Sequence, residues 1–516
     1  MLRVSHCLTL SSLTLILALA FSPGSPASED NPEDQPVKIK HIVVFGNALS
    51  DNGNTCELFD ELAGRKRPSR LRDDMRHHGP DIIDAASSML FSSGLWFGFS
   101  YMHWDKLIDK IPYAEDYFLL SRAAGISLVA TLLYHSGLAH LLAKPLDLVI
   151  DRSELLLQSM LWLYPSIGLP VLPPGQLYDA GGRFTNGPRV WAEMLATRMG
   201  LNPDNRKDFI SLAYAGSHVR DELSGDDFLS FSEWLNYLAL GSNFLDTLLH
   251  KMPTEKDSFW NIAAKNMSKD GLDKFQNLLK NDIPPSFEYL VHGYSNNQTL
   301  KETNPPDSTL YLIIYGPDDY IIDDALPSDV ISTLRKGLSA LINKDQARHI
   351  VVTHLSHLSQ LPAVKAMNKA KADTMLSKVS EHNILLNDMI RDLTTENEGV
   401  RITTLSGGEE LLKEAKAQQL SLKPCLNVID ENEEEPANAS VVHVPSMTNR
   451  TLFTDDIVRN GSSLQATYRF FGHRVSRCNN PEQHLFYDDF NLTSHGHTIV
   501  ADLVCKLLAS NGYQCR

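Results

Sequence analysis

The stretch that decides the fold is IVVFGNALSDNGN, residues 42–54. Its first four residues are branched or aromatic and predict a short buried β-strand, and the small and polar residues after them predict a tight turn. A strand that ends in such a turn is the layout that presents a catalytic nucleophile. Here Ala48 occupies the nucleophile's place in the turn, and a methyl group cannot attack an ester carbonyl.

This stretch resembles block I of the SGNH (GDSL) lipase and acyl-esterase family, which reads FGDSLSDxGN. The family's serine aligns with Ala48 and the aspartate before it with Asn47. Further segments resemble the later family blocks, in family order: 178–193, 213–217, 311–320, 354–362 and 478–493. Together they span about residues 40–56 and 173–516, and such an ordered series is far more specific than one short motif.

The resemblance implies a serine–histidine–aspartate triad, with the aspartate three residues before the histidine. Asp488 matches the aspartate, and Asn491 occupies the histidine position. An asparagine side chain has no titratable nitrogen and cannot act as a general base near neutral pH.

The resemblance also implies three donors for the oxyanion: the nucleophile's own N–H, a block II glycine and a block III asparagine. The backbone of Ala48 is retained, Gly187 is the first choice for the glycine, and Gly182 is the alternative. Asp318 replaces the asparagine, and a carboxylate would repel a developing oxyanion unless protonated. Nucleophile, base and one oxyanion donor are therefore all replaced.

A shifted register offers an alternative, in which Ser50 would act with His495 or His497. The family carries a serine and a histidine near these positions in non-catalytic roles, so we favour the first alignment. Asp51, Asp318 and Asp488 are interpreted as hydrogen-bonded loop caps; a calcium cluster is the alternative, but no ligand spacing supports it. We expect neither a resident metal nor a cofactor.

Alternation of strand-like and helix-like segments predicts an α/β fold, a three-layer α/β/α sandwich with a parallel sheet. The expected strands are 42–45, 209–213, 309–315, 349–354 and 400–405, and the clearest expected helices are 188–198, 327–342 and 372–393. The motifs end these strands, which places the site along one edge of the sheet.

The chain of 516 residues begins with an apolar stretch typical of a signal peptide, 1–27, followed by an acidic lead-in, 28–38, expected to be disordered. The family-like domain then covers 39–516, and the protein is expected to be secreted or to lie in the cell envelope. In an oxidising compartment we expect Cys425–Cys478 and Cys505–Cys515 to pair, with Cys56 outside both bridges, although five cysteines allow other pairings.

An insertion, 57–172, interrupts the expected domain. Two apolar runs, 82–101 and 123–142, reach membrane-spanning length and read as helices. The segment is interpreted as a lid-like helical subdomain; a membrane-inserting hairpin that would contact lipid through 82–142, and a surface for a protein partner, are the alternatives. A second, polar insertion is expected at 225–307.

The net charge and the replaced catalytic residues together limit the functions that the sequence allows. The net charge of −16 argues against nucleic acid as a partner. The first hypothesis is a pseudoenzyme that retains the pocket and binds a lipid, an acyl ester or a protein partner. The second is an active secreted lipase, phospholipase or acyltransferase with an unusual site.

Overall fold

The computed structural model describes residues 36–62, 172–220, 285–429 (without 316, 317, 322–324, 356, 357 and 407), 433, 434, 436, 438–445 and 467–516. The predicted signal peptide lies outside these residues. So do residues 63–171 of the predicted apolar insertion, which include the stretch 82–142, and residues 225–284 of the second insertion.

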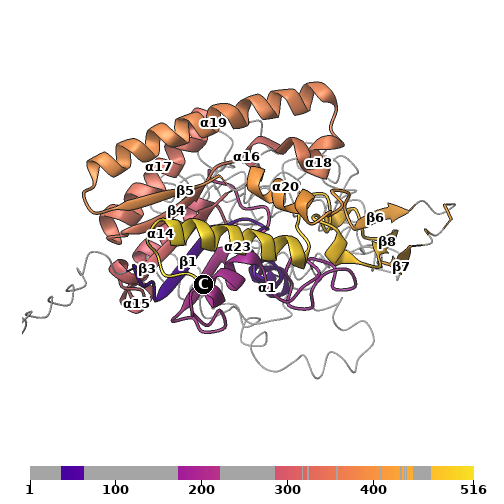
Figure 1. The fold of residues 1–516 in the computed structure, drawn as a ribbon, viewed down its shortest axis with the longest axis horizontal. Coiled ribbons are helices and arrows are strands. Elements are labelled where there is room, and N and C mark those ends of the chain that lie inside the picture. Colours follow the sequence, from indigo (N-terminus) through magenta and orange to yellow (C-terminus); the bar gives the residue numbers. More distant parts are fainter. Residues whose placement is uncertain are drawn as a thin grey trace, which may run out of the picture.

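A parallel five-stranded sheet forms the centre of the fold (Figure 1). Its strand order is β2-β1-β3-β4-β5. The strands are β1 (His41–Gly46), β2 (Phe209–Ala213), β3 (Thr309–Ile314), β4 (His349–Thr353) and β5 (Arg401–Leu405). All four pairings are parallel, so the carboxyl ends of the strands meet at one edge.

Strand β1 shows why both faces of the sheet are buried. Val43 and Phe45 point into one hydrophobic core, and Ile42 and Val44 point into another. Successive side chains in a strand point to opposite faces, so a continuous apolar run is what a sheet covered on both sides requires.

Helices from distant parts of the chain cover the two faces. The face bearing Val44 is covered by α9 (Trp191–Arg198) and α23 (Ser494–Ser510), which pack against each other. The other face is covered by α14 (Phe287–Asn296), α17 (Pro327–Lys344) and α19 (Lys369–Glu396). The three-layer α/β/α sandwich expected from the sequence is therefore confirmed.

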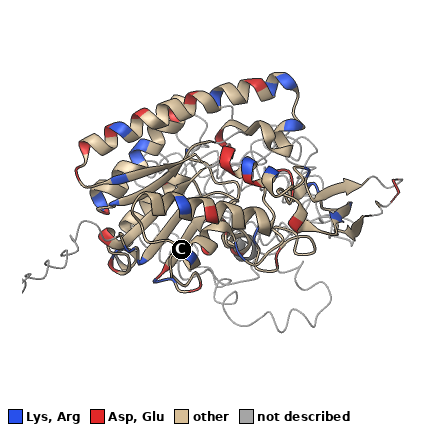
Figure 2. Ribbon diagram, viewed as in Figure 1, with Lys and Arg blue, Asp and Glu red and all other residues tan. Residues whose placement is uncertain are grey.

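Short helices complete the described part of the chain. They are α1 (Asn54–Leu62), α15 (Gln298–Thr303), α16 (Asp318–Ile321), α18 (Pro362–Lys365) and α20 (Gly408–Ala417), with 3₁₀ turns at Pro306–Ser308, Leu358–Gln360 and Pro481–Gln483. Acidic and basic residues alternate along the outer surface of α19, whereas the sheet carries few charges (Figure 2).

The expected strands agree with the observed ones to within one residue at each end. The helices differ more. The helix expected at 188–198 begins only at Trp191. The helix expected at 372–393 extends over Lys369–Glu396, and it begins earlier because Asn368 caps its first turn by accepting from the N–H of Lys371.

Part of the polar insertion expected at 225–307 belongs to the folded core. Its end contains α14, which packs Phe287, Leu290, Val291 and Tyr294 into the main core. These residues have the i, i+3, i+4, i+7 spacing of one helix face, a signal that the polar composition of the longer segment obscured.

A small antiparallel sheet with strand order β6-β8-β7 lies beside the main sheet's carboxyl edge and projects from the body of the molecule (Figure 1). Its strands are β6 (Leu426–Ile429), β7 (Ala439–His443) and β8 (Arg474–Cys478). A disulfide between Cys425 and Cys478 ties β6 to β8.

The second disulfide joins Cys505, on α23, to Cys515. Both predicted pairs are thereby confirmed, and Cys56 takes part in neither. Val37, at the end of the predicted lead-in, exchanges backbone hydrogen bonds with Gly512 and Gln514 near the other end of the chain. Among the described helices, none combines the length and the apolar character needed to cross a membrane.

Candidate active site

A pocket of about 220 Å³ lies at the carboxyl edge of the sheet, and both Ala48 and Asn491 line it. Residues at the ends of β3, β4 and β5 line it, among them Tyr315, His354 and Leu405. Its walls are largely apolar and come from separate segments: Leu49, Leu358, Leu361, Leu411, Phe486, Phe490, Leu492, Val500, Leu503 and Val504. The positions that matched the family's nucleophile and base therefore share one hydrophobic pocket.

Asn491 is held much as an orienting aspartate holds a catalytic histidine. Its side-chain Nδ2 donates to Asp488 Oδ2 at 2.9 Å, and its backbone N–H donates to Asp488 Oδ1 at 2.7 Å. Asp488 also accepts from the Tyr178 hydroxyl at 2.6 Å and from the N–H of Phe490. Burial, and next the charge of Asp488, raise the pKa of Tyr178 far above its ordinary value, so this phenol stays a donor. The orienting half of a triad is present without a titratable base.

Asn47 and Asp318 form a second buried pair. Asn47 Nδ2 donates to Asp318 Oδ2 at 3.0 Å, and Asn47 Oδ1 accepts from the N–H of Leu49. The family blocks carry aspartate at the position of Asn47 and asparagine at the position of Asp318, so the two residues are exchanged here. Both substitutions are visible in the sequence, but the sequence alone does not show that the two side chains are hydrogen-bonded to each other. The exchange keeps one carboxylate and one amide in contact.

The block II glycines do not line this pocket. Gly182 has a φ of +80°, and a Cβ there would lie 2.3 Å from the Cβ of Cys56 in α1. A Cβ at Gly187 would lie 2.3 Å from Ser494 Oγ, at the start of α23. Steric requirements alone thus explain glycine at both positions, because real Cβ contacts are never so short. An oxyanion role for either glycine stays a prediction.

The residues of the shifted register, Ser50 with His495 or His497, are hydrogen-bonded to other partners and not to each other. Ser50 is fully buried, and its Oγ accepts from the indole Nε1 of Trp191 at 3.1 Å. His497 Nδ1 accepts from the backbone N–H of Trp191, and burial lowers the pKa of His497 to about 3. His495, in the first turn of α23, is partly buried, and its Nε2 lies 2.6 Å from Gln418 Oε1. Trp191 therefore engages both the buried serine and the buried histidine through its indole and backbone N–H groups.

Asp51 caps α1. Its carboxylate accepts from the backbone N–H groups of Gly53, Asn54, Thr55 and Ala215, which ties the turn after β1 to the segment after β2. Burial raises the pKa of Asp51 to about 6. Within the described ranges, no group of three or more His, Cys, Asp or Glu side chains is placed to hold a metal ion.

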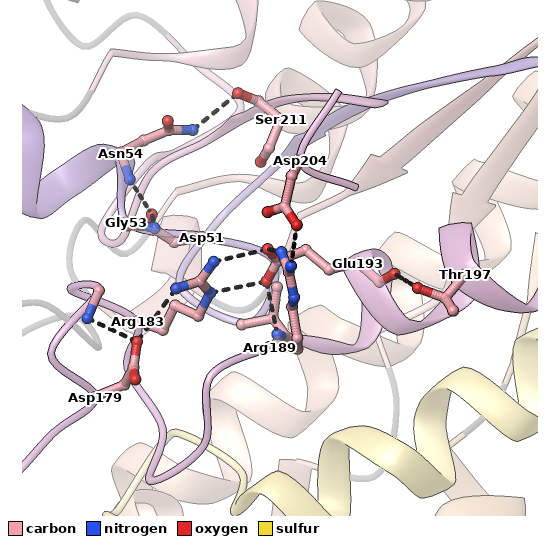
Figure 3. Close-up of polar contacts among 12 residues, drawn as sticks. Asp51, Gly53, Asn54, Asp179, Arg183, Arg189, Glu193, Thr197, Asp204 and Ser211 are labelled. Atoms are coloured by element: carbon pink, nitrogen blue, oxygen red, sulfur yellow. Dashed lines mark hydrogen bonds and ion pairs between the residues drawn. The ribbon is translucent and has the colours of Figure 1, made fainter. Parts of the chain in front are cut away.

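An ion cluster centred on the buried Glu193 supports the block II segment (Figure 3). Glu193 is 1% exposed, and its carboxylate accepts two hydrogen bonds of 2.8 Å each from the guanidinium of Arg183. Arg189 also donates to Glu193, and it pairs with Asp204 on its other side. Arg183 reaches Asp179 as well. A bidentate pair of this kind fixes geometry as well as adding attraction, which gives these motif residues a structural role.

His354 was not singled out by the sequence, yet it lines the pocket at the end of β4. Its Nε2 lies 2.8 Å from Asn387 Oδ1 and its Nδ1 lies 2.6 Å from Ser406 Oγ. His354 opens the segment 354–362, which resembles a family block, but the resemblance implies no role for a histidine at this position. Both ring nitrogens are engaged by neighbouring side chains.

Asp319 predicts a pH dependence of stability. It accepts from the N–H groups of Val219 and Arg220, and burial, with a further contribution from Asp318, raises its pKa to about 7. An unfolded aspartate titrates near pH 4, so between about pH 4 and 7 only the folded state holds this proton and stability falls as pH rises. We expect Asp319→Asn to become more stable relative to the wild type by about 3 kcal/mol over this range. Urea unfolding at several pH values measures the difference, and Asp392→Asn on exposed α19 should show no such trend.

Fold and pocket together define the class: an α/β sandwich with its site at the carboxyl edge of a parallel sheet, where such folds bind ligands. A model of the GDSL-like Lipase/Acylhydrolase family matches residues 167–504, which is more than half of the chain. The chain therefore belongs to this family. A search of curated proteins finds no match. The family match begins after residues 42–54, but β1 pairs with β2 and β3, both inside the matched range, and so brings Ala48 into the same site.

Proposed function

We propose that the protein is a catalytically inactive member of the family, a pseudoenzyme that binds a single acyl chain or acyl ester in the pocket. The observation that carries this proposal is the position of Ala48 and Asn491 in one apolar pocket. Acyl transfer needs a nucleophile and a base in contact, and neither side chain can take either role.

The size and composition of the pocket support an acyl ligand. Pockets for small molecules are mostly apolar with a few placed polar groups, and apolar cavities of about 150 Å³ already hold benzene. A cavity of about 220 Å³ with leucine, phenylalanine and valine walls suits one alkyl chain. Asn47 and Asn491 are among the polar residues that line it.

Secretion is part of the proposal. It is supported by the signal-like start of the sequence and by two disulfides, which persist in oxidising compartments. The composition of the insertion, 57–172, supports a lid-like subdomain, with a membrane or protein contact as its alternative. The net charge of −16 supports partners other than nucleic acid.

A matched pair of variants on α20 tests the binding site. Leu411 lines the pocket, whereas the adjacent Leu412 does not and lines a separate surface hollow. Both side chains are partly buried. We expect Leu411→Trp to weaken binding of p-nitrophenyl decanoate at least about tenfold, because the indole fills the space for the chain, and Leu412→Trp to change it little.

Calorimetry measures the binding, and chromatography of the recovered ester shows whether it is intact. Intact ester bound by the wild type is the expected result. Equal loss of binding in both variants, with both folded, would place the ligand elsewhere, and release of p-nitrophenol by the wild type would contradict the pseudoenzyme.

A further inference from the structure

Acceptor sequences for N-linked glycans, of the form Asn-x-Ser/Thr, are a feature of the chain that the ligand pocket leaves unexplained. In the part of the chain that the structure describes, they begin at Asn297, Asn438 and Asn491. An oligosaccharide is bulky and strongly hydrated, so a folded protein carries it on an asparagine whose side chain reaches the surface. Burial and hydrogen bonding therefore distinguish the three positions.

Two of these asparagines are buried and have structural roles. Asn297 is 0% exposed, and its Oδ1 caps the first turn of α15. Asn491 is 2% exposed, and its Nδ2, the atom that a glycan would occupy, donates to Asp488 Oδ2 at 2.9 Å. Thr493 supplies the hydroxyl of the same acceptor sequence, and this hydroxyl donates to the carbonyl oxygen of His484 at 2.7 Å. A glycan at either asparagine is incompatible with the described fold.

Asn438 differs from both. It is exposed in the turn that leads into β7, and the small sheet that contains β7 projects from the body of the molecule (Figure 1). Its carbonyl oxygen accepts from the N–H of Asn479, whereas its side-chain amide makes no hydrogen bond to another described residue. The hydroxyl of Ser440 is only weakly held, because it lies 3.4 Å from the carbonyl oxygen of Arg477. Both reactive groups of this acceptor sequence are therefore available.

We propose that Asn438 is an N-glycosylation site and that Asn297 and Asn491 stay unmodified in the folded protein. This inference rests on the secretion included in the proposed function, because glycans of this kind belong to secreted chains. In the transfer, Nδ2 of Asn438 forms a bond to the anomeric carbon of an oligosaccharide, a polyprenyl diphosphate leaves, and the amide gives up one proton. The glycan leaves the ligand site accessible, since none of the described residues of β6, β7 and β8 is among those that line the pocket.

Expression of the full-length chain in cultured insect cells tests the proposal. Glycans are released with a peptide N-glycosidase in heavy-oxygen water, which labels each asparagine that carried one, and mass spectrometry of the peptides locates the label. We expect the label at Asn438 and none at Asn297 or Asn491. Secreted protein without label at Asn438 overturns the proposal and leaves secretion intact. Protein that stays in the cytosol refutes the secretion, and the proposal with it.

A matched pair of variants shows that the label reports a glycan. Ser440→Ala removes the acceptor hydroxyl and leaves Asn438 in place, so the label there should fall at least about tenfold, whereas Ser440→Thr retains a hydroxyl and should keep it. Label that persists in Ser440→Ala would show spontaneous deamidation and overturn the proposal, as would its loss in Ser440→Thr. Both variants should bind p-nitrophenyl decanoate as the wild type does, because the site lies outside the pocket.

Discussion

Four substitutions that reinstate the family pattern should turn the protein into an esterase: Ala48→Ser, Asn491→His, Asn47→Asp and Asp318→Asn. Ala48 and Asn491 already line one pocket, and Asp488 already binds the side chain at position 491. A histidine there is expected to place one ring nitrogen on Asp488 and the other toward the new serine, which is the arrangement that activates a hydroxyl. Reversing the exchange at 47 and 318 removes the carboxylate nearest the oxyanion and keeps the buried pair intact.

We expect hydrolysis of p-nitrophenyl butyrate on the order of a hundredfold above the wild type, well short of a natural enzyme, since removing triad residues from a hydrolase costs up to about a millionfold. The control is the same variant with Ala48 left in place, which should be as inactive as the wild type.

Two results would contradict this interpretation of the site. Inactivity of the correctly folded fourfold variant would mean that the pocket does not align the restored groups. Turnover by the wild type that Ser50→Ala abolishes would favour the shifted register instead. Ser50 is fully buried and accepts a hydrogen bond from Trp191. We therefore expect no ester hydrolysis by the wild type that depends on Ser50.

Asn47→Asp alone should destabilise the protein by about 3 kcal/mol at pH 8, because it places two buried carboxylates where an amide now donates to one. Asn47 Nδ2 and Asp318 Oδ2 are 3.0 Å apart, and both residues are less than 9% exposed. Adding Asp318→Asn should recover most of the loss, since an amide–carboxylate hydrogen bond forms again with the roles reversed. Urea unfolding of the wild type, both single variants and the double variant measures the coupling.

The pH dependence provides an independent check. Two facing carboxylates raise the pKa of at least one of them, so the penalty in Asn47→Asp should shrink as pH falls and that group takes up a proton. Asn343→Asp, an exposed change near the end of α17, should cost no more than about 0.5 kcal/mol at either pH. Additive losses in the double variant would show that the two positions do not compensate each other.

The fold was readable from the sequence because its signals are local. Most strands are short apolar runs that end in a turn or loop, and the large helices begin at a capping side chain, as α19 does, or at a proline, as α17 does. Strands buried on both faces and separated by helices leave few arrangements other than a covered parallel sheet. The exception was α14, whose apolar face was hidden within a longer polar stretch.

The losses at Ala48 and Asn491 were also readable from the sequence alone, because chemical capacity belongs to the residue itself. No folded environment gives a methyl group a nucleophilic atom or an asparagine side chain a titratable nitrogen.

The relation between Asn47 and Asp318 belongs to the tertiary structure. These residues are 271 positions apart, and only the pairing of β1 with β3 brings them into hydrogen-bond contact. The sequence alone identified Asp318 as a repulsive carboxylate at an oxyanion site; the fold shows that this carboxylate already has an amide donor. The sequence thus determined which roles Ala48 and Asn491 cannot fill, whereas the packing of distant segments decided what surrounds them, because burial and hydrogen bonding depend on neighbours that only folding brings together.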